Sequence, residues 1–138
     1  MVRLPGSLIQ AQDSGMGHFY VPIQISHQSG TSFVGLQALV DTGSTYTWIP
    51  RDVLEGLRVV PAEQRPFVLA DGRRVTFPVA WVMIRLEERA QPTIVVFGEP
   101  GSQPILGAVT LEEHLLAVDP VTRRLVPVPG LLMAIETP

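Results

Sequence analysis

The residues most able to do chemistry form one triplet, Asp41-Thr42-Gly43. It follows the apolar pair Leu39-Val40 and precedes Ser44, so the carboxylate stands where an apolar run gives way to a polar loop. A carboxylate aimed by a buried strand is a candidate general acid or base. Taken alone, however, Asp-Thr-Gly is also an ordinary turn sequence. Its meaning therefore depends on what else the chain contains.

Two further motifs follow the triplet. Asp71-Gly72 lies between the β-rich runs 66–69 and 75–86, and it predicts a hairpin with a type I′ turn, whose two central residues both have positive φ. Ile105-Leu106-Gly107 is a short stretch of two hydrophobic residues and a glycine. The predicted order is therefore an acidic loop, a hairpin, and a tight apolar segment that ends in glycine.

In this order and spacing, the three motifs resemble those of the retropepsin-like aspartic proteases, which include retroviral proteases and single-domain bacterial relatives. The resemblance covers about residues 20–128. It implies that Asp41 is the catalytic acid, with Thr42, Gly43 and Ser44 supporting the catalytic loop. It also implies that Ile105, Leu106 and Gly107 thread beneath that loop. The residues that it assigns to a substrate-covering flap are Leu69, Ala70, Asp71, Gly72 and Arg73.

Enzymes of this family use two such aspartates that face each other, whereas this chain contains Asp-Thr-Gly once. The resemblance therefore implies a homodimer, in which Asp41 meets the Asp41 of a second copy. Two carboxylates held close together cannot both ionise cheaply, so the pair shares a proton. The ionised acid can take a proton from water while the protonated acid polarises a carbonyl. The implied reaction is hydrolysis of a peptide or protein substrate, with no metal or organic cofactor.

The chain departs from the retroviral pattern. Retroviral enzymes have an Arg directly after the hydrophobic-hydrophobic-glycine motif, where this chain has Ala108, and Asp residues soon after the triplet, where it has Thr45 and Tyr46. These features resemble the bacterial branch. Two alternatives stay open: a catalytically weak or inactive dimerisation and peptide-binding module of the same fold, and a structural β-barrel with a chance Asp-Thr-Gly.

A second triplet, Asp13-Ser14-Gly15, is a variant of the catalytic motif and could place both acids in one chain. We reject this reading because Gln10-Ala11-Gln12 before it is not an apolar strand. The stretch 14–40 between the two aspartates is also too short to supply a second half-domain.

The rest of the chain predicts an all-β domain, because short apolar runs are punctuated by 13 prolines and 12 glycines. We expect a small closed or partly closed retropepsin-like barrel at 17–138, preceded by a flexible arm at 1–16. One short helix near the C-terminus is expected at Thr110–Leu116, where Thr110 and Glu113 have the spacing of a capping box. A single helical turn could also form at 51–54. The strands are expected at 19–25, 33–40, 46–49, 66–69, 75–86, 93–97 and 124–128.

Composition narrows the classes of partner. The net charge of −3 disfavours nucleic acid, whose phosphates need clustered Lys and Arg. Hydrophobic residues make up 46% of the chain, which favours an oligomer, and the apolar segments 124–128 and 131–135 are expected at its interface. No apolar run is long enough to span a membrane, and without a recognisable signal peptide we expect a cytoplasmic location. The histidines at 18, 27 and 114 lack zinc-site spacing and are expected to be solvated or core residues.

Overall fold

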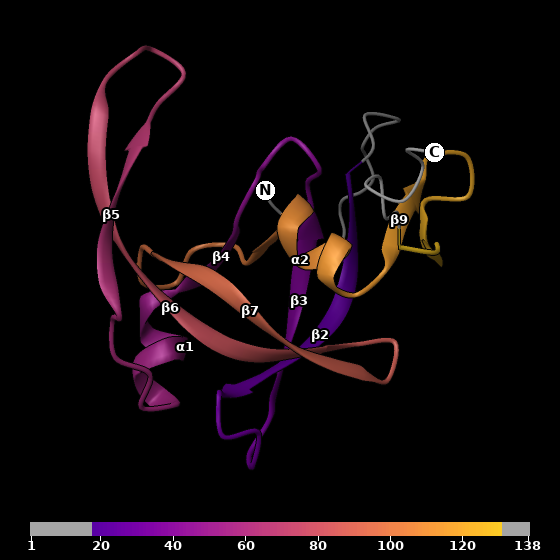
Figure 1. Cartoon of the computed structure of the whole chain (residues 1–138), viewed down its shortest axis with the longest axis horizontal. Helices are drawn as coiled ribbons and strands as arrows, with labels where there is room; N and C mark the ends of the chain where they lie inside the picture. Colours follow the sequence, from indigo (N-terminus) through magenta and orange to yellow (C-terminus); the bar gives the residue numbers. More distant parts are fainter. Residues whose placement is uncertain (1–17, 131–138) are drawn as a thin grey trace, which may run out of the picture.

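The computed structural model describes residues 18–130, so Asp13, the expected arm and the segment 131–135 lie outside the described part. A closed barrel dominates the fold (Figure 1). One sheet has the strand order β2-β3-β8-β4-β7-β6-β5, and an additional pairing of β2 with β6 closes the ring and leaves β5 outside it. The strands and helices are β2 (Phe19–His27), β3 (Val34–Val40), β4 (Thr47–Pro50), α1 (Arg51–Gly56), β5 (Glu63–Val68), β6 (Arg74–Leu86), β7 (Arg89–Gly98), β8 (Ile105–Leu106), α2 (Ala108–Glu113), β9 (Leu116–Asp119) and β10 (Arg124–Pro127).

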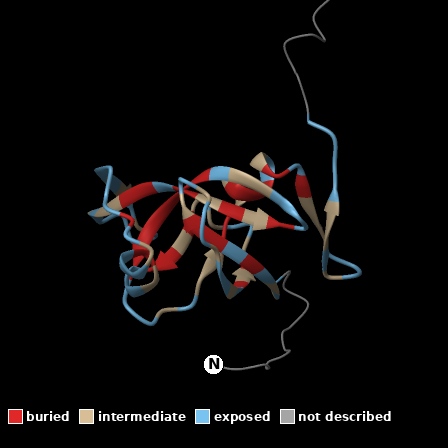
Figure 2. Ribbon diagram, turned by 90° about the horizontal axis from the view of Figure 1, so that it is seen from below, coloured by how far each residue is buried: buried red, intermediate tan, exposed pale blue. Residues whose placement is uncertain are grey.

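The core fills the inside of this barrel. In β2, the alternation expected from the sequence places Ile23 and Ile25 inward, where both are buried, while Gln24 between them is exposed. Val40 at the end of β3 and Leu106 in β8 are also fully buried. Figure 2 shows the buried residues gathered along the barrel strands. The period-two prediction for β2 is therefore confirmed, and the acidic triplet begins directly after a core strand.

The structure contains two short helices among residues 18–130: α1, where the sequence allowed a helical turn at 51–54, and the expected helix near the C-terminus. The second, α2, begins at Ala108 with Gly107 as its N-cap, and it ends before β9 starts at Leu116. The predicted capping box is wrong, because the Thr110 hydroxyl is buried and bonds other threonine hydroxyls instead of the first turn of the helix. Tertiary contacts thus override a local capping signal.

The hairpin of β5 and β6 forms as predicted, but its turn is not type I′. Gly72 has a φ of 89°, whereas Asp71 is not among the residues with positive φ. The Leu69 N–H donates to the Arg73 carbonyl at 2.8 Å, and the Gly72 N–H donates to the Leu69 carbonyl at 2.9 Å. This is a three-residue loop in which a type I turn is followed by a left-handed glycine. Asp71 is kept in the turn because its Oδ1 accepts the Arg73 N–H at 3.0 Å.

The two-residue turn with two positive φ angles lies elsewhere, between β6 and β7. Glu87 and Glu88 have φ values of 52° and 71°, and the flanking Leu86 and Arg89 are paired across the strands. No glycine or asparagine marks this turn, so it could not be predicted from the residue types.

Candidate active site

Asp41 is the first residue after β3, and two neighbouring strands fix its main chain. Val40 pairs with Phe19 of β2 on one side and with Leu106 of β8 on the other. The Asp41 N–H donates to the Leu106 carbonyl at 3.0 Å. The acidic residue therefore leaves the barrel with its backbone still attached to the core.

The Asp41 carboxylate is held by its own loop and is open to solvent. Its Oδ1 accepts the Gly43 N–H at 2.9 Å, while the Ser44 N–H donates to the Asp41 carbonyl at 3.0 Å. The Asp41 side chain is 33% exposed, and His18 Nε2 lies 3.5 Å from Oδ1. A carboxylate that is oriented by a backbone donor and still reached by solvent can exchange protons with a bound water.

Gly107 packs directly against this loop. A Cβ at position 107 would collide with the Tyr46 carbonyl oxygen and would lie 2.7 Å from the Ser44 carbonyl oxygen. Because two backbone segments touch here, only glycine fits. The Gly107 N–H donates to Thr47 Oγ1 at 3.0 Å, which joins the segment after β8 to the start of β4.

A chain of buried hydroxyls extends this support into the core. Thr47 Oγ1 lies 2.6 Å from Thr110 Oγ1, which in turn lies 2.8 Å from Thr93 Oγ1, and all three residues are fully buried. The sequence analysis named Thr110 only as a helix cap and did not connect it with Thr47 and Thr93, because their spacing along the chain carries no common signal. Only the fold brings β4, β7 and α2 to one point.

The start of α2 closes the loop from the other side. The Ala108 and Val109 N–H groups donate to the Ser44 and Thr45 carbonyls at 2.8 and 3.0 Å. Ser44 Oγ donates to the Tyr46 carbonyl at 2.7 Å. The helix thus uses its unsatisfied N-terminal donors to hold the acidic loop in place of a side-chain cap.

Thr42 is exposed, and no hydrogen bond of its side chain occurs within residues 18–130. The family resemblance implies that its hydroxyl bonds the backbone of a second copy, and this stays a prediction.

The β5–β6 hairpin extends well beyond the barrel (Figure 1). Its tip, residues 69–73, is exposed except for the half-buried Leu69. Asp71 Oδ2 accepts Arg73 Nε at 2.8 Å. The backbone N–H of Arg73 first, and its guanidinium second, hold the pKa of Asp71 below the usual carboxyl value. The tip is therefore ordered by bonds among its own residues.

An aromatic cluster joins the base of the hairpin to the strand after the acidic loop. The Tyr46 and Phe67 rings meet edge to face at 5.5 Å, and the Trp48 and Phe77 rings do so at 4.9 Å. Arg65 Nη1 donates to the Tyr46 hydroxyl at 3.2 Å. The sequence analysis did not connect these four aromatic residues, although both pairs alternate with polar or exposed positions on their strands.

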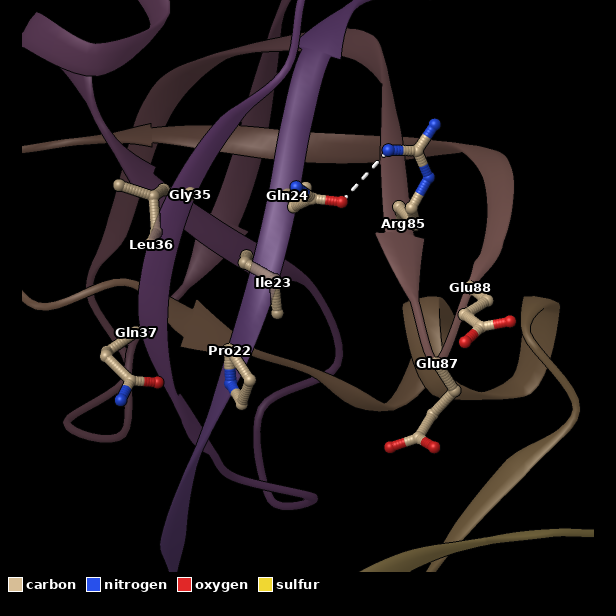
Figure 3. A pocket seen from close by; sticks show the side chains of 9 residues that line it. All are labelled: Pro22, Ile23, Gln24, Gly35, Leu36, Gln37, Arg85, Glu87 and Glu88. Carbon is tan, nitrogen blue, oxygen red and sulfur yellow. Dashed lines mark hydrogen bonds between the residues drawn. The ribbon is translucent and has the colours of Figure 1, made fainter.

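A surface cavity of about 520 Å³ lies elsewhere, between the outer face of β2–β3 and the β6–β7 turn (Figure 3). Arg85 Nη1 donates to Gln24 Oε1 at 2.9 Å at its wall. None of the residues assigned to the acidic loop or the hairpin tip lines it. We do not assign the active site to this cavity, because the acids that line it are Glu87 and Glu88, which are both exposed.

Residues 18–130 contain no group of three or more His, Cys, Asp or Glu side chains that could hold a metal ion. Within the same range, no helix is long and apolar enough to cross a membrane.

Solved structures with the same fold include several proteases. A retropepsin-like aspartic protease from Rickettsia conorii aligns with a TM-score of 0.54 and 16% identity, over 74% of this chain and 76% of that one. The retroviral protease-like domain of Ddi1 from Leishmania major aligns with a TM-score of 0.54 and 20% identity, over 83% and 94%. The protease of EIAV, solved with an inhibitor, aligns with a TM-score of 0.51 and 18% identity, over 70% and 88%.

These alignments establish a retropepsin-like fold, mostly β with two short helices. No curated protein matches the chain significantly. A family model described as aspartyl protease matches residues 21–109, which span the acidic loop, the hairpin and the Ile105-Leu106-Gly107 segment. Since that match covers more than half of the chain, the protein belongs to the retropepsin-like aspartyl protease family.

Proposed function

We propose that the chain is an aspartic endopeptidase, which hydrolyses peptide bonds with two Asp41 carboxylates brought together in a homodimer. The observation that carries this proposal is the setting of Asp41. Its carboxylate is oriented by the Gly43 N–H and remains 33% exposed, in a loop supported from below by Gly107. Such a loop presents an acid in a fixed direction while leaving one side free for a second acid.

The second acid is proposed to come from a second copy because the chain contains Asp-Thr-Gly once. A two-fold contact is self-complementary, so one loop docking on its twin brings Asp41 to Asp41. The exposed Thr42 is well situated to bond the backbone of the opposite loop. β10 lies outside the barrel and belongs to the C-terminal surface proposed to bury area in the dimer.

In the proposed reaction, the ionised Asp41 takes a proton from a water whose oxygen attacks the peptide carbonyl carbon. The protonated Asp41 gives its proton to the carbonyl oxygen, so a neutral tetrahedral diol forms. The diol then loses a proton from one hydroxyl to a carboxylate as the C–N bond breaks, and the leaving nitrogen is protonated by the other acid. Atoms and charge balance, and the dyad returns to its singly protonated state.

The β5–β6 hairpin is proposed to act as the flap. An extended peptide between the dyad and residues 68–74 would add backbone hydrogen bonds as a strand does. The exposed Val68 and the tip beyond it supply such a surface.

The direct test is digestion of a peptide library by the wild-type chain and by Asp41→Asn. We expect the variant to lose activity by roughly 10²-fold or more, because each dimer loses both acids, while its thermal stability changes little. Wild-type activity should survive a metal chelator and should be blocked by a statine-type transition-state analogue. Equal hydrolysis by the two proteins would disprove the catalytic role of Asp41.

The main alternative, a catalytically weak or inactive peptide-binding module, is favoured by Ala108, which occupies the position of the retroviral Arg. Sedimentation, combined with a peptide-cleavage assay, separates the enzyme from the binding module. A dimer that binds peptide without cleaving it supports the module, whereas a strictly monomeric chain that still cleaves peptide would place the second acid within one chain.

A further inference from the structure

His18 lies opposite Asp41 because of the register between β2 and β3. Phe19 pairs with Val40 in this antiparallel ladder, so His18, just before β2, faces Asp41, just after β3. His18 Nε2 is 3.5 Å from Asp41 Oδ1, the same oxygen that accepts the Gly43 N–H. Directly opposed side chains of neighbouring strands are close enough to interact. A basic group therefore stands beside the acid proposed to be catalytic.

A second contact holds His18 in this position. Arg123 Nη2 donates to the His18 carbonyl oxygen at 2.7 Å. Arg123 belongs to the turn between β9 and β10, where its N–H donates to the Asp119 carbonyl at 2.8 Å. The C-terminal hairpin thus fixes the main chain of the residue that faces Asp41.

The charged groups around His18 come from two elements. Asp41 follows β3, and Arg123 reaches across from the β9–β10 turn. Asp119 and Arg124 flank the same turn, and the backbone N–H of Thr122 is the largest influence that lowers the pKa of Asp119. The Asp41 carboxylate contacts the His18 imidazole directly.

We propose that His18 is a positioning residue for the Asp41 dyad: its ring, held 3.5 Å from Asp41 Oδ1, fixes the direction of the carboxylate. This inference rests on the proposed function. In a homodimer, two His18 rings would flank two carboxylates and hold each of them toward the other.

The test compares the kinetic profile, kcat and KM measured separately, for the wild type, His18→Gln and His18→Ala. Alanine removes the side chain beside Asp41 Oδ1, so we expect kcat to fall severalfold while KM changes little. Glutamine keeps an N–H donor at this position, so it should retain more of the wild-type kcat than alanine does. His27→Gln removes a histidine at the far end of β2 and serves as the matched control, with an unchanged profile.

A readout independent of catalysis is the side-chain ¹⁵N resonance of His18 at fixed pH, in the wild type and in Asp41→Asn. We expect the His18 resonances to change and those of His27 to remain. Unchanged His18 resonances, or an active wild type whose profile is shared by both His18 variants, would overturn the inference while leaving the proposed function intact. A wild-type chain that cleaves no peptide would overturn the proposed function, and this inference with it.

Discussion

The acidic loop 41–47 and the hairpin tip 69–73 are held in opposite ways. Thr47 bonds Gly107 and Thr110, which lie 60 and 63 residues further along the chain. Within the tip, the bonds of Leu69, Asp71 and Arg73 join residues at most four positions apart. The loop therefore shares the stability of the core, whereas the tip can open without breaking long-range bonds. A site that must fix an acid and still admit a substrate needs both arrangements.

One glycine in each region shows the same difference. Gly107 has no room for a Cβ because backbone atoms touch it. Gly72 has nothing within 4 Å of a Cβ, but its φ of 89° disfavours any other residue. Steric exclusion cannot be relieved without moving β4 or β8, while an unfavourable φ can be relieved by a local change of turn.

Gly107→Ala should have the largest effect. The added Cβ meets backbone rather than a flexible side chain, so we expect a loss of about 3 kcal/mol or more in the free energy of unfolding, or failure to fold. Denaturant titration at fixed protein concentration measures it. Gly56→Ala at the end of α1 is the control, because it has open space and no positive φ. If the two variants were equally stable, the close contact beneath the loop would be wrong.

Thr110→Val should come next. It removes the hydroxyl between Thr47 and Thr93 and leaves two buried partners short of a bond, which costs about 1–3 kcal/mol. Thr76→Val, at an exposed position of β6, makes the same chemical change on the surface and should be close to neutral. Thermal unfolding of the two variants side by side checks this. A Thr110 variant as stable as the Thr76 variant would show that the hydroxyl chain does not support the loop.

Much of the region around the acidic loop was predictable from the sequence. The alternation in β2, the apolar run that leads to Asp41 and the Ile105-Leu106-Gly107 segment are local patterns with one physical cause each, and the structure has them where expected. The triplet and its distant support could be connected only through the family resemblance, since nothing local links residue 44 to residue 107.

The errors arose where a contact that the sequence pattern does not show outweighed the usual preference of the motif. Thr110 has the right spacing for a cap, but its hydroxyl bonds more favourably inside the core. Asp71-Gly72 is the usual type I′ pair, yet the bond from Arg73 to the Asp71 side chain selects another turn, while Glu87-Glu88 adopts the type I′ angles. His18 was expected to be an ordinary solvated or core histidine, because a cross-strand contact cannot be seen without the register.

Gly72→Ala should have a smaller effect than either change near the loop. A Cβ at this left-handed position costs about 1–2 kcal/mol locally, and the tip can relax. We therefore expect altered peptide binding, seen as a changed KM, with little change in the unfolding midpoint. Gly72→Asn should retain more of the wild-type behaviour because asparagine tolerates positive φ. A global destabilisation as large as that of Gly107→Ala would mean that the tip is not independent of the core.

Asp71→Asn should have the smallest effect, confined to the pH dependence of the tip. The pKa of Asp71 is lowered, chiefly by the Arg73 N–H, so its bonds are fully formed above the ordinary carboxyl pKa. They are lost only as the pH falls through the lowered value, and the tip should stay ordered in mildly acidic solution. The amide proton shift of Arg73, followed from neutral to acidic pH, should change in the wild type and stay flat in the variant. A flat wild-type curve would contradict this account.

The shortest strand of the barrel also determines how late in synthesis the acidic loop can gain its support. β8 has two residues, yet it lies between β3 and β4, parallel to the first and antiparallel to the second. β3 and β4 are close in sequence, but β8 lies between them in the sheet, so residues 105 and 106 are needed to join them. Because a chain is made from its N-terminus and distant contacts form slowly, a nascent chain has synthesised nearly the whole barrel before Asp41 gains its support. Asp41 is thus synthesised early and gains its supporting contacts late.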